Sequence, residues 1–366
     1  MPTLDHDKLA VLTGDILARG GAGPEEARSV ARHLVDANLA GHDSHGVAMV
    51  PAYVEHLLAG TVQPETAAEV VKDDGAILVF DGCRGFGRRV GGKAMAAAID
   101  RCREAGLVLL GLRDAHHLGR IGAFGEMAAE AGLISIHFVN VYDHRGLVAP
   151  FGGRDARFST NPVCVALPRV DEAPPLLLDM ATSRVAFGKV NVAHNKGQRL
   201  PGEFLVDPQG RFTDDPAAMF QEPIGALLPF GEHKGFGLAV VCELLAGLLA
   251  GGGTIQPENP REGGILNNML AILIDPARLA DGHWLNTEME AFIDYVKASP
   301  PLDPANPVLV PGESERIFRE RRLAEGIEID PGTWQAIMEA AARVGLEAAD
   351  VGKLTGESSF GRDERH

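Results

Sequence analysis

The stretch LVLLGLRDAHHLGRIGAFGEMAAEAGLISIHFV, residues 107–139, decides the fold class of this chain. Leu107 to Leu112 is an apolar, strand-like run, and Ile121 to Ala131 has helical apolar spacing that ends at Gly132. Leu133 to Val139 is apolar and β-branched again. A strand, a helix and a second strand in succession predict an α/β core.

The same alternation continues on both sides of this stretch. Ala76 to Phe80 predicts a strand, and the alanine-rich run after it predicts a helix that ends at Gly106. Further strands are expected at three apolar runs, Val163 to Leu167, Leu176 to Leu178 and Leu270 to Ile274.

The two ends of the chain favour helices. Pro24 opens an amphipathic helix that stops at Gly41, and a second amphipathic run from Val47 is closed by Gly60. Beyond the proline-rich connector that follows residue 300, a last helix is predicted from Asp330 and Pro331 to Val344, and the polar end from Gly356 to His366 is expected to fray.

Composition excludes several classes of function. The 366 residues carry 34 Lys and Arg against 50 Asp and Glu, a formal charge of −16, which disfavours nucleic-acid binding. The longest apolar run, Leu238 to Leu249, contains Glu243 and is too short to span a bilayer, so we expect a buried helix. The four cysteines lack metal-binding spacing and the N-terminus lacks a secretory signal, so we expect a cytoplasmic protein with no metal and no membrane partner.

One glycine motif suggests a dinucleotide-binding loop. Gly85, Gly87 and Gly91 follow a predicted strand and precede a helix, as a phosphate-binding turn would. However, the spacing is GxGxxxG, Arg88 would crowd the turn, and Asp100 falls inside the following helix. A plain glycine turn is the favoured interpretation.

Two histidine-containing loops are candidates for proton transfer. Asp43-Ser44-His45-Gly46 is typical of a polar linker between helices, but it also places a hydroxyl beside an imidazole that titrates near neutral pH. His116 and His117 follow a predicted strand, at the end where α/β sheets collect ligands. The alternatives there are a buried structural histidine or a zinc site, and zinc is disfavoured because no Cys or HExxH partner is present.

Three further segments offer groups that bind anions. Asp179 to Ser183 and Ser159 to Pro162 place small polar residues next to predicted strands, and His233 to Gly237 opens the apolar helix with a lysine. Helix caps and a solvated lysine are the simplest interpretations. The same backbone amides and ammonium group would also bind a phosphate or a carboxylate.

Taken in order, six motifs resemble the type-2 malate/L-lactate dehydrogenase family of NAD(P)-dependent oxidoreductases, from about Leu9 to Leu346. The motifs are GHDSHGV, HHLGRIG, STNP, LLLDMATSRVAFGK, EHKGFGLA and VPGE. Within the family the likeness is to the hydroxycarboxylate-type subgroup, through SHGVAM, AHHLGRIG and PFGEHKGFGLAVVCELL.

The resemblance implies an α/β, mixed-sheet fold that is distinct from the Rossmann domain and is interleaved with a helical region. It also implies a homodimer that uses NAD or NADP. We therefore expect an N-terminal helical region at 1–75, a cofactor- and substrate-binding core at 76–310, and a C-terminal helical region at 311–366 that packs back on the core.

The resemblance further implies roles for individual residues. His45 and His117 form the polar pair at the nicotinamide, and Ser44 orients the His45 ring. Many relatives carry a carboxylate-binding arginine where this chain has Met49, so Arg120 and Arg145 are candidates to replace it. Met49 and Tyr53 would favour a larger or less polar substrate than malate. Cofactor contacts are implied for Gly119, Arg120, Ile121, Asn140, Thr160, Asn161, Asp179, Met180, Ala181, Thr182, Ser183, His233, Lys234, Gly235, Asn267, Pro311, Gly312 and Glu313.

We hypothesise reversible hydride transfer between C2 of a 2-hydroxy acid and a nicotinamide ring, with His45 or His117 handling the proton. Malate, lactate, hydroxypyruvate, phenylpyruvate and a cyclic imino acid stay open as substrates. A non-catalytic dinucleotide-binding protein is one rival hypothesis. A serine hydrolase built on Asp43-Ser44-His45 is disfavoured, because consecutive residues cannot face one another as a triad does and GxSxG is absent.

Overall fold

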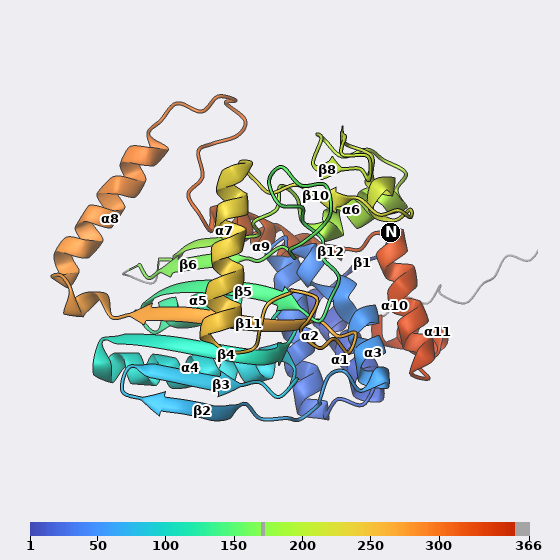
Figure 1. Ribbon diagram of the computed structural model, residues 1–366, viewed down its shortest axis with the longest axis horizontal. Coiled ribbons are helices and arrows are strands. Elements are labelled where there is room, and N and C mark those ends of the chain that lie inside the picture. Colours follow the sequence, from blue (N-terminus) through green and yellow to red (C-terminus); the bar gives the residue numbers. More distant parts are fainter. Residues whose placement is uncertain (170–172, 356–366) are drawn as a thin grey trace, which may run out of the picture.

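The centre of the molecule is a seven-stranded sheet, seen in a computed structural model that describes residues 1–169 and 173–355 (Figure 1). Its strand order is β2-β3-β4-β11-β5-β6-β7. The strands are β2 (Glu69–Asp74), β3 (Ile77–Asp81), β4 (Leu107–His116), β5 (Ile134–Tyr142), β6 (Val163–Leu167), β7 (Leu176–Met180) and β11 (Leu266–Ile274). Within this sheet β3 and β4 are parallel and the other neighbouring pairs are antiparallel. The α/β, mixed-sheet prediction is therefore confirmed, and the sheet is not a doubly wound parallel one.

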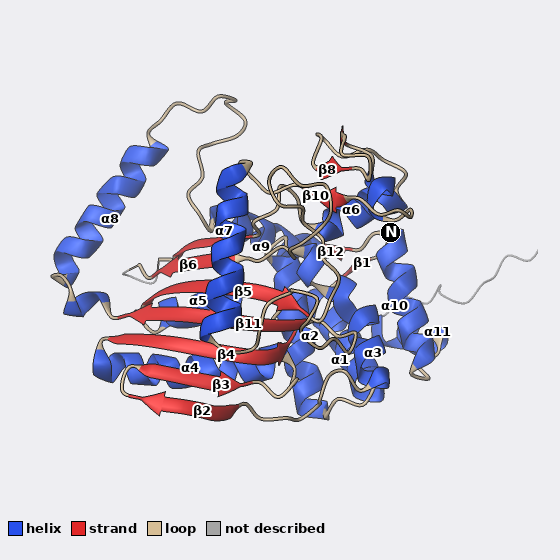
Figure 2. Ribbon diagram, viewed as in Figure 1, coloured by secondary structure: helices blue, strands red, loops and turns tan. Residues whose placement is uncertain are grey.

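Helices α4 (Gly87–Ala105) and α5 (Gly122–Glu130) cover one face of this sheet (Figure 2). Val108, Leu110 and Leu112 alternate along β4 and are fully buried in the core that these helices share with the strands. β11 is inserted between β4 and β5 although it follows them by more than a hundred residues. That insertion brings the loop after β4 beside a segment that is remote in sequence.

Helix α7 (His233–Leu244) crosses the other face and continues as a π-helical turn, Leu245–Leu249. The sequence predicted a helix that is buried all round, and this prediction is wrong. The helix contacts the sheet through one side only, which includes the buried Ala239 and Cys242. Its outer side exposes an apolar stripe in which Val241 and Leu244 are each 44% exposed and Leu248 is 60% exposed.

A second core joins the two ends of the chain. It is built from α1 (His6–Arg19), α2 (Pro24–Leu39), α3 (Val50–Ala59), α10 (Pro331–Arg343), α11 (Ala348–Thr355) and the pair β1 (Thr3–Leu4) with β12 (Ile327–Glu328). The Asp330 side chain accepts a hydrogen bond from the Thr333 amide and caps α10 as predicted. The prediction that this is the last helix is wrong, because α11 follows it, and the predicted fraying from Gly356 to His366 lies outside the described residues.

Three further parts complete the described structure. A small lobe contains α6 (Phe187–Asn195), β8 (Leu205–Val206), β9 (Phe212–Thr213) and β10 (Ala226–Leu227). Helix α9 (Glu313–Glu325) lies beside α2, whereas α8 (Gly282–Lys297) stands away from the sheet (Figure 1). No helix in the described ranges is long and apolar enough to cross a membrane. The division at 75 and 310 stays a prediction.

Candidate active site

The loop that carries His45 is organised by the end of α2. It consists of two short 3-10 turns, Asp43–His45 and Val47–Met49. The Asn38 carboxamide accepts a hydrogen bond from the Val47 amide at 2.8 Å and donates one to the Asp43 carboxylate at 2.6 Å. A Cβ on Gly46 would lie 2.2 Å from the Asn38 oxygen, so only glycine fits there. Ser44 Oγ lies 3.0 Å from His45 Nδ1 and fixes the ring.

The Asp43 carboxylate is paired with Arg322 rather than with His45. Arg322 of α9 donates two hydrogen bonds to it, at 2.6 and 2.9 Å. Such a bidentate pair holds the carboxylate away from the Ser44–His45 pair. The serine-hydrolase alternative therefore gains no support.

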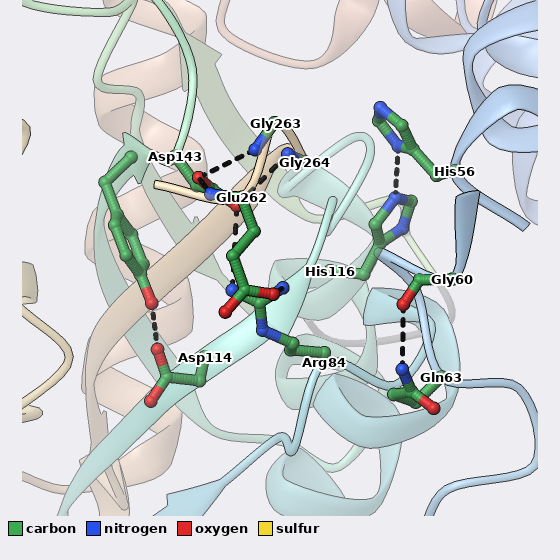
Figure 3. Close-up of polar contacts among 11 residues, drawn as sticks. His56, Gly60, Gln63, Arg84, Asp114, His116, Asp143, Glu262, Gly263 and Gly264 are labelled. Atoms are coloured by element: carbon green, nitrogen blue, oxygen red, sulfur yellow. Dashed lines mark hydrogen bonds and ion pairs between the residues drawn. The ribbon is translucent and has the colours of Figure 1, made fainter. Parts of the chain in front are cut away.

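The second histidine loop begins at the end of β4. The Tyr53 hydroxyl lies 2.8 Å from His117 Nδ1. His56 Nδ1 lies 2.8 Å from His116 Nε2 (Figure 3). The glycine turn that resembled a phosphate loop packs against this backbone. A Cβ on Gly87 would lie 2.4 Å from the carbonyl oxygens of both His116 and His117. Close packing therefore explains that glycine.

His45 and His117 meet in space. Their ring centroids are 5.6 Å apart and the two planes are inclined by 25°. The structure thus stacks two imidazoles that belong to different cores, one on the loop after α2 and one on the loop after β4. Their catalytic role stays a prediction, and of the two rings only His45 belongs to the lining of the neighbouring cleft.

Burial keeps these imidazoles neutral. It lowers the pKa of His45 to about 4, and the nearby Asp179 carboxylate offsets only part of that effect. Burial and the neighbouring imidazoles lower the pKa of His117 well below its usual range. Burial also lowers the pKa values of His33 and His116 to about 3 and raises that of Tyr53. We call His33, His45, His56, His116, His117 and Tyr53 the imidazole cluster.

A cleft of about 950 Å³ opens beside His45. Ten of the residues predicted from the sequence line it: Ser44, His45, Gly119, Arg120, Ile121, Thr160, Asp179, Met180, Ala181 and Ser183. Thr182 is buried behind them and donates through its amide and hydroxyl to the Thr160 carbonyl oxygen. The Asp179 carboxylate accepts a hydrogen bond from the Gly122 amide at 2.7 Å, at the start of α5.

Arg120 is the buried cation of this region. The residue is 2% exposed, and its Nη2 donates to the Glu126 carboxylate. Its Nε and Nη1 atoms have no hydrogen-bond partner within the described ranges. A Cβ on Gly122 would lie 2.6 Å from Nη1 and 2.8 Å from the Asp179 carboxylate, so this glycine leaves room for both charged groups.

Three residues predicted to contact the cofactor form a buried network around Glu243, and their cofactor contacts stay a prediction. The Glu243 carboxylate accepts hydrogen bonds from the side chains of Asn140 at 3.0 Å and Asn161 at 2.7 Å and from the Ile255 amide at 2.7 Å. Asn267 donates to the Asn140 carbonyl oxygen and accepts from the Leu118 amide at 2.8 Å. We call Asn140, Asn161, Asn267, Asn268 and Glu243 the amide network, and it supports the backbone next to His117.

Other predicted residues lie outside the lining of the cleft. His233 and Lys234 are exposed at the start of α7, next to the buried Gly235. The Pro311 carbonyl oxygen accepts from the Leu177 amide of β7, and Gly312 and Glu313 continue from there into α9. Met49 packs against the helical core, and Arg145 is exposed with its guanidinium 6.0 Å from the centre of the Phe187 ring. Their roles stay predictions.

Sequence reasoning missed the groups that hold the two loops, chiefly Asn38, Arg322, His33 and His56. An asparagine in the last turn of α2, directly before the His45 loop, was a local signal for Asn38. The other three are remote in sequence from the loops that they support, so no local pattern could reveal them. Across the described residues, no group of three or more His, Cys, Asp or Glu side chains is arranged to hold a metal ion.

Comparison with known proteins agrees with this architecture. The family model for malate/L-lactate dehydrogenase matches residues 4–338. Hydroxycarboxylate dehydrogenase B of Escherichia coli (strain K12) is 47% identical over 328 residues, covering 89% of this chain and 90% of that protein. The predicted likeness to that subgroup is therefore confirmed.

Solved structures give the same result. A candidate malate/lactate dehydrogenase from Escherichia coli superposes with a TM-score of 0.92 at 43% identity, covering 98% of this chain and 99% of that one. Δ1-Piperideine-2-carboxylate reductase from Pseudomonas syringae pvar. tomato superposes with a TM-score of 0.80 at 31% identity, covering 93% and 100% of the two chains. This chain belongs to the malate/L-lactate dehydrogenase family.

Proposed function

We propose that this protein is an NAD- or NADP-dependent oxidoreductase that interconverts a 2-hydroxy acid and the corresponding 2-oxo acid. The observation that carries the proposal is the stacking of His45 against His117, with ring centroids 5.6 Å apart, at the edge of a cleft of about 950 Å³. Family membership supports the reaction class, and the two imidazoles supply the proton chemistry that it needs.

The cleft fits a dinucleotide. Polar backbone and side-chain groups line it from Gly119 to Ile121, at Thr160, from Asp179 to Ala181 and at Ser183, and Arg120 adds a cation with two unpartnered donor atoms. These residues would hold the cofactor's polar groups. A bound nicotinamide ring supplies or accepts the hydride.

The chain itself handles the proton. A neutral imidazole is ready to accept the substrate's hydroxyl proton in the oxidative direction, and the lowered pKa values of His45 and His117 keep both rings neutral near pH 7. In the reductive direction, a substrate carboxylate beside these rings would raise their pKa values and favour the imidazolium that returns the proton. Ser44 and Tyr53 orient His45 and His117 through their Nδ1 atoms.

The substrate carboxylate needs a cation, which Met49 cannot provide. Arg120 is favoured by its unpartnered Nε and Nη1 atoms beside the cleft. Arg145 is the alternative, because it lies over Phe187, whose neighbour Gly188 abuts Ser44. Malate, lactate, hydroxypyruvate and phenylpyruvate all carry the carboxylate that either arginine would bind.

A cyclic imino acid is the second candidate substrate. The likeness to Δ1-piperideine-2-carboxylate reductase, with a TM-score of 0.80 at 31% identity, favours it. The same imidazole would then protonate nitrogen in place of oxygen.

A substrate panel tests these proposals. The purified chain is mixed with NADH or NADPH and each 2-oxo acid or Δ1-piperideine-2-carboxylate, and the absorbance of the reduced nicotinamide is followed. We expect at least one 2-oxo acid to consume one of the two cofactors. Consumption with the imino acid alone would replace the first candidate by the second. Cofactor binding without any consumption would contradict both and favour a non-catalytic dinucleotide-binding protein.

We also propose a homodimer whose interface includes the exposed stripe of Val241, Leu244 and Leu248. Supporting it, these side chains recur every three or four residues on the outer side of α7 and of the π-helical turn that continues it, and such apolar stripes typically mark association surfaces. Sedimentation should give twice the chain mass for the parent protein and the chain mass for a variant with Leu244→Glu and Leu248→Glu. The exposed Val11→Glu on α1 is the matched control. A monomeric parent would contradict the homodimer.

A further inference from the structure

A second pocket, of about 590 Å³, lies beside the active-site cleft. It is bounded by α2, the start of α4, α5 and Arg319 of α9, and Arg120 belongs to the lining of both cavities. Its charged lining residues are Arg28, Arg32, Arg88, Arg120, Arg319, Glu25, Asp36, Glu126 and Glu130. Five cations thus face four carboxylates. The ion pairs among them determine which positive charges remain available to a ligand.

Two of the carboxylates are occupied. Glu126 accepts from Arg120, and Asp36 accepts from Arg319 at 3.2 Å. Within the described ranges, Arg28, Arg32 and Arg88 form no ion pair with any carboxylate. The Nη1 atom of Arg88 instead contacts the Met127 sulfur at 3.7 Å. The remaining acids, Glu25 and Glu130, are exposed near opposite ends of their helices.

The inner wall of the pocket is the most positive part. Arg120 is almost fully buried and keeps two unpartnered donor atoms, and Arg88 is half-buried. His33 also lines the pocket, with Nε2 3.0 Å from the Leu118 carbonyl oxygen. Burial, aided by the charge of Arg88, lowers its pKa to about 3, so the ring adds no charge of its own near pH 7. Buried guanidinium donors without partners, such as Nε and Nη1 of Arg120, cost free energy, which a bound anion would offset.

We propose that this pocket binds the phosphate group of a small molecule through Arg32, Arg88 and Arg120. Guanidinium groups match phosphate oxygens bidentately, and the volume lies within the usual range for small-molecule sites. Phosphate would give Arg32 and Arg88 the anionic partner that the chain does not supply, and it would approach the donor atoms of Arg120 that Glu126 leaves unpartnered. The proposal goes beyond the reaction at the imidazole cluster and does not rest on it, because binding is measured without turnover.

Titration calorimetry of the full chain with inorganic pyrophosphate at low ionic strength tests this site. We expect binding by the parent protein and affinity at least tenfold weaker for Arg32→Ala and for Arg88→Ala. Arg32 is exposed, so its substitution leaves the fold intact even if the half-buried Arg88 proves sensitive. Arg154→Ala, an exposed arginine outside both cavities, is the matched control and should bind like the parent. No binding by the parent, or equal affinities for the parent and both pocket variants, would overturn the proposal.

The same titration in the presence of saturating NAD or NADP distinguishes two sources of the phosphate. Displacement of pyrophosphate by NADP but not by NAD would assign the pocket to the extra phosphate of NADP. Displacement by both would assign it to their shared diphosphate. Displacement by neither would assign it to a separate phosphorylated molecule. Each of these results supports phosphate binding, provided that the two arginine variants weaken it.

Discussion

Two groups of polar side chains flank the backbone of His117 and Leu118, and they differ in chemistry. The imidazole cluster consists of groups that gain or lose protons, and His45 lines the cleft with His117 stacked on it. The amide network surrounds one carboxylate with non-titrating donors, and Asn140, Asn267 and Glu243 lie outside the cleft lining. His45 and His117 are only half-buried, whereas every member of the amide network is buried. The amides fix the shape of the loops, while the imidazoles can transfer a proton.

The largest effect is expected at the imidazoles themselves. His45→Ala or His117→Ala should lower turnover roughly 10²- to 10⁴-fold, the usual contribution of a positioned acid or base, while dinucleotide binding persists. Steady-state kinetics and cofactor titration measure the two properties separately. His283→Ala, an exposed histidine on α8, should leave turnover unchanged. Parent-like turnover in both active-site variants would remove the imidazoles from the reaction.

Substitutions in the amide network should lower the free energy of unfolding. Glu243→Ala leaves the Ile255 amide and one N–H of each of the Asn140 and Asn161 side chains without an acceptor. A buried donor without a partner costs about 1–3 kcal/mol, so the free energy of unfolding should fall by roughly 3 kcal/mol or more. Urea unfolding measures this change. Glu243→Gln, which keeps the shape and part of the acceptor capacity, should lose less. A large loss of turnover without a loss of stability would contradict the structural role assigned to the amide network.

Acidification should destabilise the protein through the imidazole cluster. Folding lowers the pKa values of His33 and His116 from 6.5 to about 3, so the folded state binds fewer protons than the unfolded chain. This contribution to stability is therefore present well above pH 6.5 and is lost as the pH falls, by about 2 kcal/mol for each such histidine between pH 7.5 and pH 5.

Urea unfolding at pH 7.5 and pH 5 checks this dependence. His33→Gln, which can still donate to the Leu118 carbonyl oxygen, should reduce the difference between the two pH values relative to the parent. Identical differences in the parent and the variant would show that His33 is not held neutral by the fold.

The smallest effect should come from Tyr53→Phe. The change removes the 2.8 Å hydrogen bond to His117 Nδ1 and leaves the ring packing in place. We expect about a tenfold lower turnover, corresponding to one hydrogen bond, together with a shifted pH–rate profile. Unchanged thermal stability with a shifted profile would mark Tyr53 as a positioning residue. An unchanged profile would mean that His117 needs no partner at Nδ1.

Local sequence patterns predicted much of the fold. The strand at Val163–Leu167 and the helix opened by Pro24 and stopped at Gly41 agree with the structure, because alternation, caps and glycine act over a few residues. The insertion of β11 between β4 and β5 was not predictable, since strand order depends on contacts across the whole chain. The exposed side of α7 was not predicted for a related reason. An apolar sequence does not show whether a helix is covered on all sides or, as here, by the sheet on one side only.

In the candidate active site, too, local motifs were predictable and contacts between distant segments were not. The motifs around His45 and His117 singled out both histidines, because loops beside helix and strand ends carry local signatures. The hydrogen bonds of Asn140, Asn161 and Asn267 to the network around Glu243 were not predictable, since an amide side chain can bind a ligand or a buried carboxylate equally well and the sequence does not say which lies nearest. The sequence by itself determined the elements and the chemical groups available. The tertiary structure alone decided which buried groups found partners, because hydrogen bonding and desolvation depend on neighbours that only folding brings together.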